Sequence, residues 1–368
     1  MIYIRADANP NIGMGHIMRC LSIADAFTSV GNNVCFVLAD DTVQSLVQSR
    51  GYETIILHSD YRGMDAELSF WPSIFLDLII VDSYFVTADY LRSLQNRLKE
   101  SGGKLIYLDD VYAFPYPVDI LVNYNAYASP HLYTDLYRGS TVPQLILGPT
   151  YAPLRSMFCN IPKRIQKEQV KNILISTGGS DELHLALALL RGVMSREARG
   201  IEYHFLLGAM NADKEEIQKL SDGRGNIVLH ENVADMKSLI QSVDLAISAA
   251  GSTLYEISAC GVPLITYSLA DNQILGAEAF EKLGLAVNIG DLRDPESIDQ
   301  ALVMSGTLSS DAVERILAAA DDLSCDYERR VAVGKQMQEL IDGYGADRMV
   351  QRIVEMSKKL CYFMSVGC

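Results

Sequence analysis

The segment Asp244–Gln273 reads DLAISAAGSTLYEISACGVPLITYSLADNQ and contains the pattern that decides the fold class. An apolar run, Leu245–Ser248, leads through Gly251 into a short helical pattern that ends near Gly261. A second apolar run, Pro263–Tyr267, follows directly. Continuous apolar runs of strand length, joined through a helix, are typical of buried parallel strands. The segment therefore predicts a parallel sheet with helices on its faces.

The same alternation extends over most of the 368 residues. Helical patterns such as Ile17–Val30 and Asp89–Ser101 lie between the apolar runs. Two successive α/β alternations predict two doubly wound domains. The expected strands are Ile2–Ala6, Val34–Leu38, Thr54–Leu57, Leu76–Val81, Lys104–Leu108, Ile120–Val122 and Gln144–Leu147 in the first part, and Asn172–Ser176, Tyr203–Leu207, Asn226–Leu229, Leu245–Ser248, Pro263–Tyr267 and Leu285–Ile289 in the second.

Domain boundaries follow from these alternations and from a change in composition. We expect an N-terminal domain over residues 1–158 and a second domain over 172–305. The charged and polar stretch 159–171 between them is interpreted as a linker. Residues 306–360 show helical periodicity only and are expected to pack back on the N-terminal domain, followed by a tail at 361–368.

Composition excludes several classes of protein. A net charge of −15 argues against a nucleic-acid-binding protein, which would usually need a basic face. No apolar run is long enough to span a membrane, and no signal peptide is expected. Seven cysteines without paired spacing indicate reduced thiols and a cytoplasmic protein. No C-x-x-C or H-E-x-x-H motif is present, so no metal is predicted.

The first candidate loop is DANPNIGMGH, between the strand Ile2–Ala6 and the following helix. Gly13 and Gly15 would let the backbone approach a ligand closely. His16 falls in the first helical turn, where the positive helix end favours a neutral imidazole that can act as a base. The spacing alone leaves two interpretations open: a catalytic base, or a glycine-rich turn with an incidental histidine.

A second loop, ISTGGSD, follows the strand Asn172–Ser176. Gly178 and Gly179 precede a helix expected near Ser180, which would form a phosphate cradle of backbone N–H groups. It is not a Walker motif, because no Gly-Lys-Ser/Thr follows. A plain strand-to-helix turn is the alternative.

The third loop lies within the opening segment. Ser252 and Thr253, after Gly251, could bind a diphosphate through their hydroxyl and N–H groups. Glu256, about one turn later, could accept hydrogen bonds from two ribose hydroxyls. However, Thr253 and Glu256 also fit the capping-box pattern T-x-x-E, and the pattern alone favours that cap.

A fourth loop follows the strand Leu76–Val81, where Asp82, Ser83 and Tyr84 should point into the same crevice. Tyr84 could hydrogen-bond a sugar or a phosphate. The alternative is that Tyr84 is a half-buried packing residue.

Together these blocks resemble one family. The landmarks are RADANPNIGMGHIMRCLSIA, IIVDSYF, LDD at Leu108–Asp110, LILGPTYAPLR, ISTGGSD and AAGSTLYEISACGVPLITYSLADNQ. They are similar to the UDP-2,4-diacetamido-2,4,6-trideoxy-β-L-altropyranose hydrolases of the pseudaminic-acid pathway and to related spore-coat polysaccharide proteins. The resemblance covers residue 1 to about residue 290. More distantly, the chain looks like the glycosyltransferase MurG.

The resemblance implies a GT-B fold, with two Rossmann-like domains and an active site in the cleft between them. It implies His16, Tyr84 and Asn272 as catalytic residues and Glu256 as the ribose ligand. It also implies a uracil contact through the backbone of Val233. The remaining residues implied in binding UDP and the sugar are Gly13, Met14, Gly15, Arg155, Gly178, Gly179, Ser180, Gly251, Ser252, Thr253 and Gln273.

The implied reaction is hydrolysis of a UDP-linked deoxy-diacetamido sugar by water attack at C1 with inversion, without a metal or cofactor. A glycosyltransferase that uses a UDP-amino sugar donor is the alternative, and a binding protein without turnover is a third. The expected partner is the small-molecule UDP-sugar, and the expected state is a monomer or weak homo-oligomer. The family often reads D-Q-N where this chain has Asn123-Tyr124-Asn125, which leaves the exact sugar open.

Overall fold

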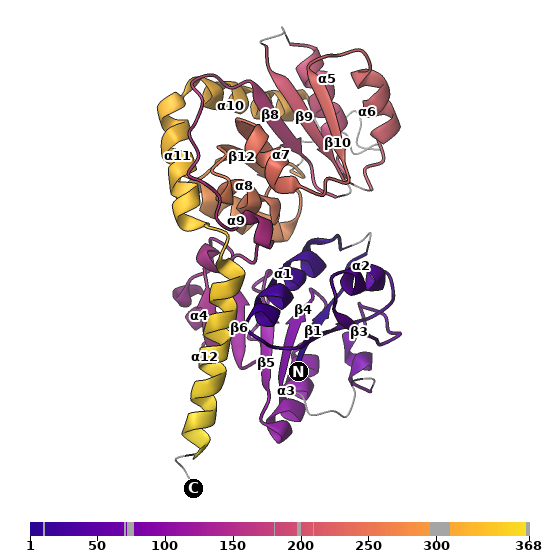
Figure 1. Cartoon of the computed structure of the whole chain (residues 1–368), viewed down its shortest axis with the longest axis vertical. Coiled ribbons are helices and arrows are strands. Elements are labelled where there is room, and N and C mark those ends of the chain that lie inside the picture. The colour runs from indigo at the N-terminus through magenta and orange to yellow at the C-terminus, as the bar shows by residue number, and fades with distance from the viewer. Residues whose placement is uncertain are drawn as a thin grey trace. The chain divides into compact units, whose positions relative to one another are not determined.

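The chain forms two compact units, which we describe separately (Figure 1). Unit 1 comprises Met1–Ser156 and Tyr344–Cys368, and unit 2 comprises Met157–Gly343. The structure is a computed structural model and describes residues 1–9, 12–69, 71, 77–179, 181–196, 200–208, 210–294 and 310–365.

Unit 1 is built on a parallel sheet of seven strands in the order β3-β2-β1-β4-β5-β6-β7. Crossover connections separate its strands, as parallel pairing requires, and all but the one from β5 to β6 contain a helix or a 3-10 turn. The strands are β1 (Ile2–Ala6), β2 (Val34–Leu38), β3 (Glu53–Ile56), β4 (Leu78–Asp82), β5 (Lys104–Leu108), β6 (Ile120–Asn123) and β7 (Gln144–Leu147). The helices of this unit are α1 (Gly15–Ser29), α2 (Gln44–Ser49), α3 (Ala88–Ser101), α4 (Pro130–Leu136) and α12 (Gly345–Ser365), with 3-10 turns η1 (Met64–Ser69) and η2 (Pro149–Tyr151).

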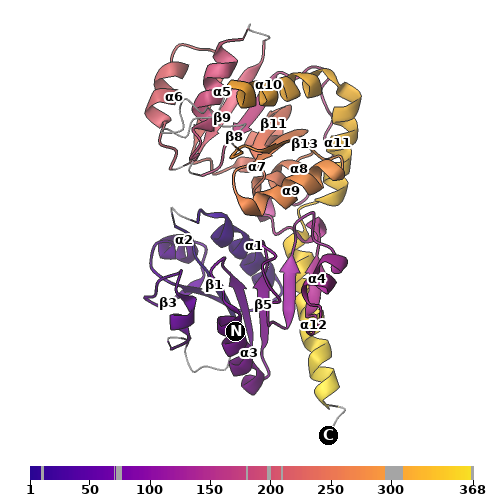
Figure 2. The ribbon, with the colours of Figure 1, turned by 180° about the vertical axis from the view of Figure 1, so that it is seen from behind.

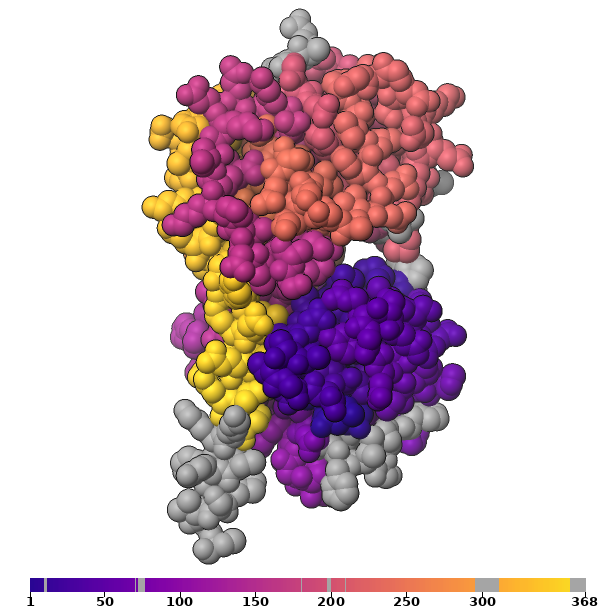
Figure 3. Space-filling view, in the orientation of Figure 1, coloured from indigo at the N-terminus to yellow at the C-terminus, as the bar shows by residue number. Residues whose placement is uncertain are grey.

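Both faces of this sheet are covered, which is why its strands are apolar at nearly every position. Ile4 of β1 lies in the core that α1 and α12 share, where Met349 and Ile353 of α12 are buried. Tyr3, the preceding residue, points to the opposite core with Leu94 of α3. The C-terminal helix α12 thus returns to the N-terminal unit and lies beside α1, as Figures 2 and 3 show.

Unit 2 contains a parallel sheet of six strands in the order β10-β9-β8-β11-β12-β13. Its strands are β8 (Asn172–Ser176), β9 (Glu202–Leu207), β10 (Ile227–Glu231), β11 (Leu245–Ala249), β12 (Leu264–Ser268) and β13 (Val287–Asp291). Its helices are α5 (Leu185–Met194), α6 (Lys214–Ser221), α7 (Met236–Ser242), α8 (Thr253–Ala259), α9 (Asp271–Lys282), α10 (Ser310–Cys325) and α11 (Tyr327–Leu340).

A buried arginine fastens the helical end of unit 2 to the segment before β8. Arg330 of α11 donates to the backbone carbonyls of Leu323 at 3.0 Å, Lys167 at 2.9 Å and Glu168 at 2.7 Å. Its partners are neutral carbonyls, and burial lowers its pKa. The segment 159–171, expected as a linker, contains no helix or strand and lies within unit 2.

The predicted fold class is confirmed: both sheets are parallel and each expected strand has a counterpart. Eight strands differ from their expected bounds by one or two residues at one end or both. For example, β4 extends to Asp82, and β13 spans Val287–Asp291 where Leu285–Ile289 was expected. Leu76, the first residue of one expected strand, lies outside the described residues. Within the described part of the chain, no helix combines the length and apolarity needed to cross a bilayer.

The start of α12 gives a stability prediction. A Cβ on Gly345 would lie 2.1 Å from the carbonyl oxygen of Ala152, so Gly345→Ala should lower the free energy of unfolding by about 1–3 kcal/mol through overpacking. Gly276→Ala in α9 is the matched control, because its Cβ would meet no atom within 4 Å and alanine favours a helix. The midpoint of urea unfolding should therefore fall for Gly345→Ala and rise for Gly276→Ala. A wild-type midpoint for Gly345→Ala would contradict the close contact.

Candidate active site

His16 lies in the first turn of α1, against the last residue of a neighbouring strand. Its Nδ1 is 2.6 Å from Oδ1 of Asp82. The strands β1 and β4 are adjacent and Ala6 pairs with Asp82, so the turn after β1 brings His16 over the carboxyl end of β4. Both side chains are buried, His16 at 4% and Asp82 at 1% exposed. The pair joins two segments that lie 66 residues apart in sequence.

Arg19 holds the same carboxylate in a two-point ion pair. Its Nε donates to Asp82 Oδ2 at 2.6 Å, and a terminal nitrogen donates to Oδ1 at 2.5 Å. Burial alone would raise the pKa of Asp82, but the charges and hydrogen bonds of Arg19 and His16 overcome it and hold that pKa below its usual value. Asp82 is therefore an ionised acceptor at neutral pH.

This arrangement fixes the tautomer of His16. Nδ1 is also 3.0 Å from a terminal nitrogen of Arg19, but a guanidinium can only donate and it is already engaged by Asp82. An ionised Asp82 can only accept, so Nδ1 carries the proton and donates to it. The lone pair of His16 is then on Nε2, and no hydrogen bond to Nε2 is found among the residues that the structure describes. A carboxylate that orients a histidine in this way prepares Nε2 to act as a base.

A second carboxylate extends the cluster. Asp110 follows β5, and its Oδ2 accepts from Arg19 at 2.9 Å and from the hydroxyl of Tyr84 at 3.0 Å. Asn125, just after β6, donates to Oδ1 at 2.7 Å. Arg19 also donates to the hydroxyl of Tyr124 at 2.9 Å. The carboxyl ends of β1, β4, β5 and β6 thus contribute to one polar network, as expected where parallel strands end at one edge.

Tyr84 closes this network beside His16. The two rings meet edge to face, with centroids 4.3 Å apart and an interplanar angle of 77°. Tyr84 is 37% exposed, whereas His16 and Arg19 are buried, so its ring forms part of the surface over the base. His16, predicted from the first loop, and Asp82 and Tyr84, predicted from the fourth, therefore lie together.

The glycines before His16 leave room for a ligand. Gly13 has φ +73°, a conformation that L side chains rarely adopt, and its N–H donates to Asn9 at 2.8 Å. A Cβ on Gly13 or Gly15 would meet no atom of the described residues within 4 Å. Met14 between them is 45% exposed. Arg155, also implied in binding, is half-buried in the segment after η2.

The loop after β8 in unit 2 has a tightly fixed backbone. Gly178 has φ +90°, and a Cβ on Gly208 would lie 2.4 and 2.2 Å from the carbonyl oxygens of Gly178 and Gly179. Met210 N–H donates to the carbonyl of Gly179 at 3.3 Å. Ser180, predicted to bind with them, lies outside the described residues. The two glycines are thus positioned by close backbone contact with the residue that follows β9.

The helix expected near Ser180 was placed wrongly, because α5 begins at Leu185. The carboxylate of Asp181 accepts from the N–H groups of Leu185 at 3.0 Å and Ala186 at 2.9 Å. Burial raises the pKa of Asp181, with those backbone hydrogen bonds opposing the shift. Since Asp181 occupies two of the first N–H groups of α5, this helix end is not an open phosphate cradle.

The loop after β11 differs from the capping-box interpretation that the sequence favoured. Ser252 occupies the N-cap of α8 without a side-chain cap hydrogen bond, and Thr253 is the first helical residue. The helix begins one residue earlier than that pattern requires, because Leu254 N–H already donates to Gly251 and Tyr255 N–H to Ser252. The cap at Thr253 is therefore wrong. Glu256 lies in the first turn, half-buried.

Three further predicted residues belong to unit 2. Asn272 and Gln273 lie in the first turn of α9. The side-chain oxygen of Gln273 accepts from Leu269 N–H at 2.8 Å, so this oxygen stabilises the helix start and the amide nitrogen is left as its donor. Val233 is half-buried in the loop between β10 and α7.

Solved structures with known folds support the architecture. MurG from Acinetobacter baumannii superposes with a TM-score of 0.63 over 97% of this chain and 99% of its own, at 13% identity. The chain has a GT-B fold, with two Rossmann-like domains. Residues 172–324 match the model of the glycosyltransferase family 28 C-terminal domain.

Curated relatives confirm the resemblance drawn from the sequence. The spore coat polysaccharide biosynthesis protein SpsG of Bacillus subtilis is 24% identical over 94% of this chain and 95% of its own length. The UDP-2,4-diacetamido-2,4,6-trideoxy-β-L-altropyranose hydrolase of Campylobacter jejuni is 28% identical over 68% of this chain and 85% of its own length. The uncharacterized protein MJ1062 of Methanocaldococcus jannaschii is 27% identical over 72% of this chain, a match that spans 54% of that protein.

The cluster also contains four residues that were not predicted from the sequence: Arg19, Asp110, Tyr124 and Asn125. A signal for Arg19 was present, because residues three apart on a helix share a face, and Arg19 lies three after His16. Asp110 and Asn125 follow strands, as the predicted loops do. Tyr124 stands at the centre of Asn123-Tyr124-Asn125, where the resemblance often has D-Q-N, and there it accepts from Arg19.

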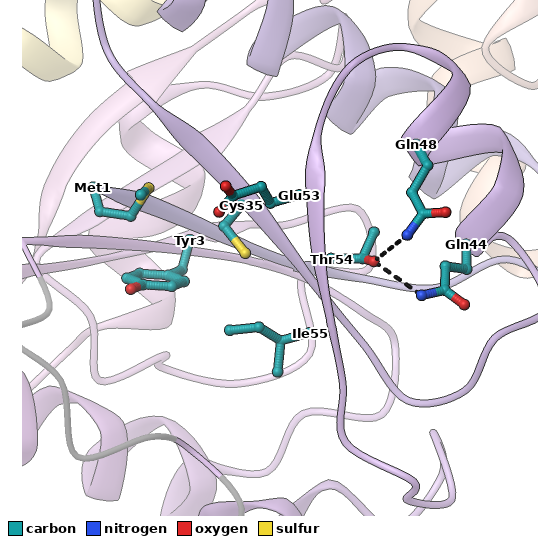
Figure 4. Close-up of a pocket in the computed structure, with 8 residues that line it drawn as sticks. All are labelled: Met1, Tyr3, Cys35, Gln44, Gln48, Glu53, Thr54 and Ile55. Atoms are coloured by element: carbon teal, nitrogen blue, oxygen red, sulfur yellow. Dashed lines mark hydrogen bonds between the residues drawn. The ribbon is translucent and has the colours of Figure 1, made fainter.

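Two further features concern metal binding and a cavity. Among the described residues, no group of three or more His, Cys, Asp or Glu side chains is arranged to hold a metal ion. A cavity of about 400 Å³ in unit 1 is lined by residues that include Met1, Tyr3, Cys35 and Ile55 (Figure 4). Gln44 and Gln48 of α2 also line it, and their side-chain amides donate to the hydroxyl of Thr54. The cavity lies near the amino ends of β1 and β2, so it is not part of the candidate site.

The depressed pKa of Asp82 makes stability depend on pH. A carboxylate with a lowered folded-state pKa stabilises the fold above its ordinary pKa of about 4, and this contribution is lost as the pH falls toward the folded value. Asp82→Asn should cost roughly 3–5 kcal/mol at pH 7, because it leaves Arg19 and His16 without their anion. The difference in the free energy of unfolding between Asp82→Asn and wild type should become smaller below about pH 4.

Urea unfolding at pH 7, 5 and 3.5 measures this dependence. Asp135→Asn is the control, because Asp135 forms an exposed ion pair with Arg138 and its loss should change the stability little at any pH. An Asp82→Asn deficit that stays constant from pH 7 to 3.5 would show that the carboxylate charge is not what stabilises the cluster.

Proposed function

We propose that the protein hydrolyses a UDP-linked 2,4-diacetamido-2,4,6-trideoxy sugar or a close analogue to the free sugar and UDP, within nonulosonic (pseudaminic) acid biosynthesis. The observation that carries this proposal is the His16–Asp82 pair, which leaves Nε2 of a buried histidine available as a base. The similarity to a protein named as such a hydrolase supports the choice of substrate.

The proposed chemistry is a single displacement at the anomeric carbon. The water oxygen bonds to C1 while the bond between C1 and the phosphate oxygen breaks, and the electron pair leaves with UDP. Nε2 of His16 takes the proton that the water loses, and Asp82 stabilises the imidazolium that forms. Attack opposite the leaving group inverts the configuration at C1. Gly13, Met14 and Gly15 would face the substrate, since the space in front of both glycines is open.

We propose that unit 2 binds the nucleotide. The N–H and hydroxyl groups of Gly251, Ser252 and Thr253 would hold the diphosphate, since Ser252 is not engaged as a side-chain cap. Glu256 would accept from the ribose hydroxyls, and the backbone of Val233 would contact uracil. Asn272 and the amide nitrogen of Gln273 would donate to the sugar or phosphates. Gly178 and Gly179 would contribute through their backbone, without the end of α5, where Asp181 already lies. Arg155 is assigned to the substrate through the family pattern alone.

A glycosyltransferase with the same donor is the second candidate. The match to a glycosyltransferase family 28 domain and the GT-B fold favour it. The two functions share the nucleotide contacts and differ in whether water or an acceptor hydroxyl attacks C1. A binding protein without turnover is disfavoured by the oriented His16–Asp82 pair, which binding alone would not require.

Hydrolysis in ¹⁸O-labelled water separates these functions. A screen of UDP-linked deoxy-amino sugars, with EDTA present, should release UDP together with a free sugar that carries ¹⁸O at C1. Transfer would give UDP release only with an acceptor and no label at C1, and binding without UDP release would indicate the third function. Activity that EDTA abolishes and magnesium restores would contradict the metal-independent mechanism.

Variants of the histidine pair test the base. His16→Asn should lower kcat by at least roughly a hundredfold, because the variant lacks the ring nitrogen that takes the proton from water. Asp82→Asn should lower kcat strongly as well, since an amide cannot stabilise the imidazolium, while UDP affinity measured by calorimetry stays near wild type for both. His131→Asn, at an exposed position on α4, is the matched control. Near-wild-type turnover by His16→Asn would exclude His16 as the base.

A further inference from the structure

The hydrogen bond between Tyr84 and Asp110 has a direction that the structure determines. Asp110 Oδ2 receives the Tyr84 hydroxyl at 3.0 Å and Arg19 at 2.9 Å, and its Oδ1 receives Asn125 at 2.7 Å. The Asp110 side chain is only 12% exposed. Burial would raise the pKa of Asp110, but Arg19 and Asn125 outweigh it and the pKa is lowered. An ionised carboxylate has no proton to give, so Tyr84 is the donor.

The single hydroxyl proton of Tyr84 is therefore committed to Asp110. Burial and the negative charge of Asp110 both raise the pKa of Tyr84, so the phenol keeps this proton at neutral pH. Toward any other group, the phenol oxygen can offer only its lone pairs. Tyr84 is also the exposed member of the cluster, and its ring centroid lies 4.3 Å from that of His16. A ligand held at His16 thus meets an acceptor at this oxygen.

We propose that Asp110 is a positioning residue that fixes Tyr84 as a hydrogen-bond acceptor, so that the site selects a ligand with an N–H or O–H donor beside His16. This inference rests on the proposed function for the identity of the ligand. The proposed sugar carries two acetamido N–H groups and a ring hydroxyl, each a suitable donor. A phosphate diester oxygen is an acceptor only, so Tyr84 recognises the sugar and not the diphosphate.

The same geometry separates Tyr84 from proton transfer. If Tyr84 protonated the departing UDP, a phenolate would remain beside the Asp110 carboxylate, and both charges would lie in a largely buried network. Tyr84 therefore acts in recognition, and His16 remains the group that moves a proton. Arg19 connects the two roles, since it donates to Asp110 and to Asp82.

Substrate analogues test the inference. The probes are UDP-2,4-diacetamido-2,4,6-trideoxy-β-L-altropyranose and three analogues that each lack one donor: N-methyl at the 2-acetamido group, N-methyl at the 4-acetamido group, and 3-deoxy. Tyr84→Phe should raise KM for the parent roughly 3- to 10-fold, the value of one neutral hydrogen bond, with kcat changed by less than about twofold. For one of the three analogues, the difference in KM between wild type and Tyr84→Phe should disappear. That analogue already lacks the donor that would bind to the Tyr84 oxygen.

Asp110→Asn should likewise weaken the preference for the parent over that analogue, since it frees the Tyr84 proton to turn toward the ligand. Tyr52→Phe is the matched control: Tyr52 also donates its hydroxyl to a carboxylate, that of Asp25 at 2.5 Å, and should leave KM unchanged. A loss of kcat of a hundredfold or more in Tyr84→Phe, with a limb of the pH profile removed, would overturn the inference. The inference would also be overturned if the ratio of the KM of Tyr84→Phe to that of wild type were the same for all three analogues.

Failure of the proposed function gives a different result. If wild-type protein releases no UDP from the parent, the hydrolase proposal fails. Calorimetric titration of the same four compounds into wild type and Tyr84→Phe then tests the inference, and the same pattern of affinities is expected. Equal affinities in both proteins, or no binding of any of the four, would overturn it.

Discussion

The carboxylate of Asp82 is the anion around which the candidate site is organised. Two cationic or donor side chains of one helix, His16 and Arg19, converge on it at hydrogen-bond distance. Taking a carboxylate out of water is costly unless it is paired and fully hydrogen-bonded, and Asp82 meets both conditions. Its ionised state decides that Nδ1 of His16 carries the proton and that Nε2 is the basic nitrogen. The chemistry proposed for the protein follows from that assignment.

The sheet supplies the geometry that this ion pair needs. Parallel strands present their carboxyl ends at one edge, so the turns after β1, β4, β5 and β6 place side chains from distant segments in one network. Not every polar residue at this edge takes part. Asp109 precedes Asp110, yet its carboxylate accepts from Tyr116 at 3.0 Å and Tyr133 at 2.5 Å and is buried within the fold. Adjacent carboxylates thus have separate roles, one structural and one at the cluster.

Carboxylates also limit where an anionic ligand can bind in unit 2. The glycine pair after β8 suggested a helix N-terminus open to phosphate, but the carboxyl group of Asp181 already accepts the N–H groups at that position. The N-terminus of α8 has no such side-chain cap. The two glycine loops therefore differ in what they can offer a diphosphate, although their sequences suggested the same use. The difference depends on one acidic residue and on where each helix begins.

The sequence by itself determined the parallel α/β architecture, the two successive alternations and the loops that carry the candidate residues. These features are local: strand-length apolar runs, glycine turns and helical periodicity can be read within short windows. The resemblance to known proteins added the GT-B arrangement and the assignment of His16. Only the tertiary structure decided that Asp82 is the partner of His16, that Arg19 joins Asp82 to Asp110, and that α10 and α11 belong to unit 2 whereas α12 belongs to unit 1. Those contacts join residues far apart in the chain, and they depend on strand order and on which buried charges can be neutralised, which no short window of sequence specifies.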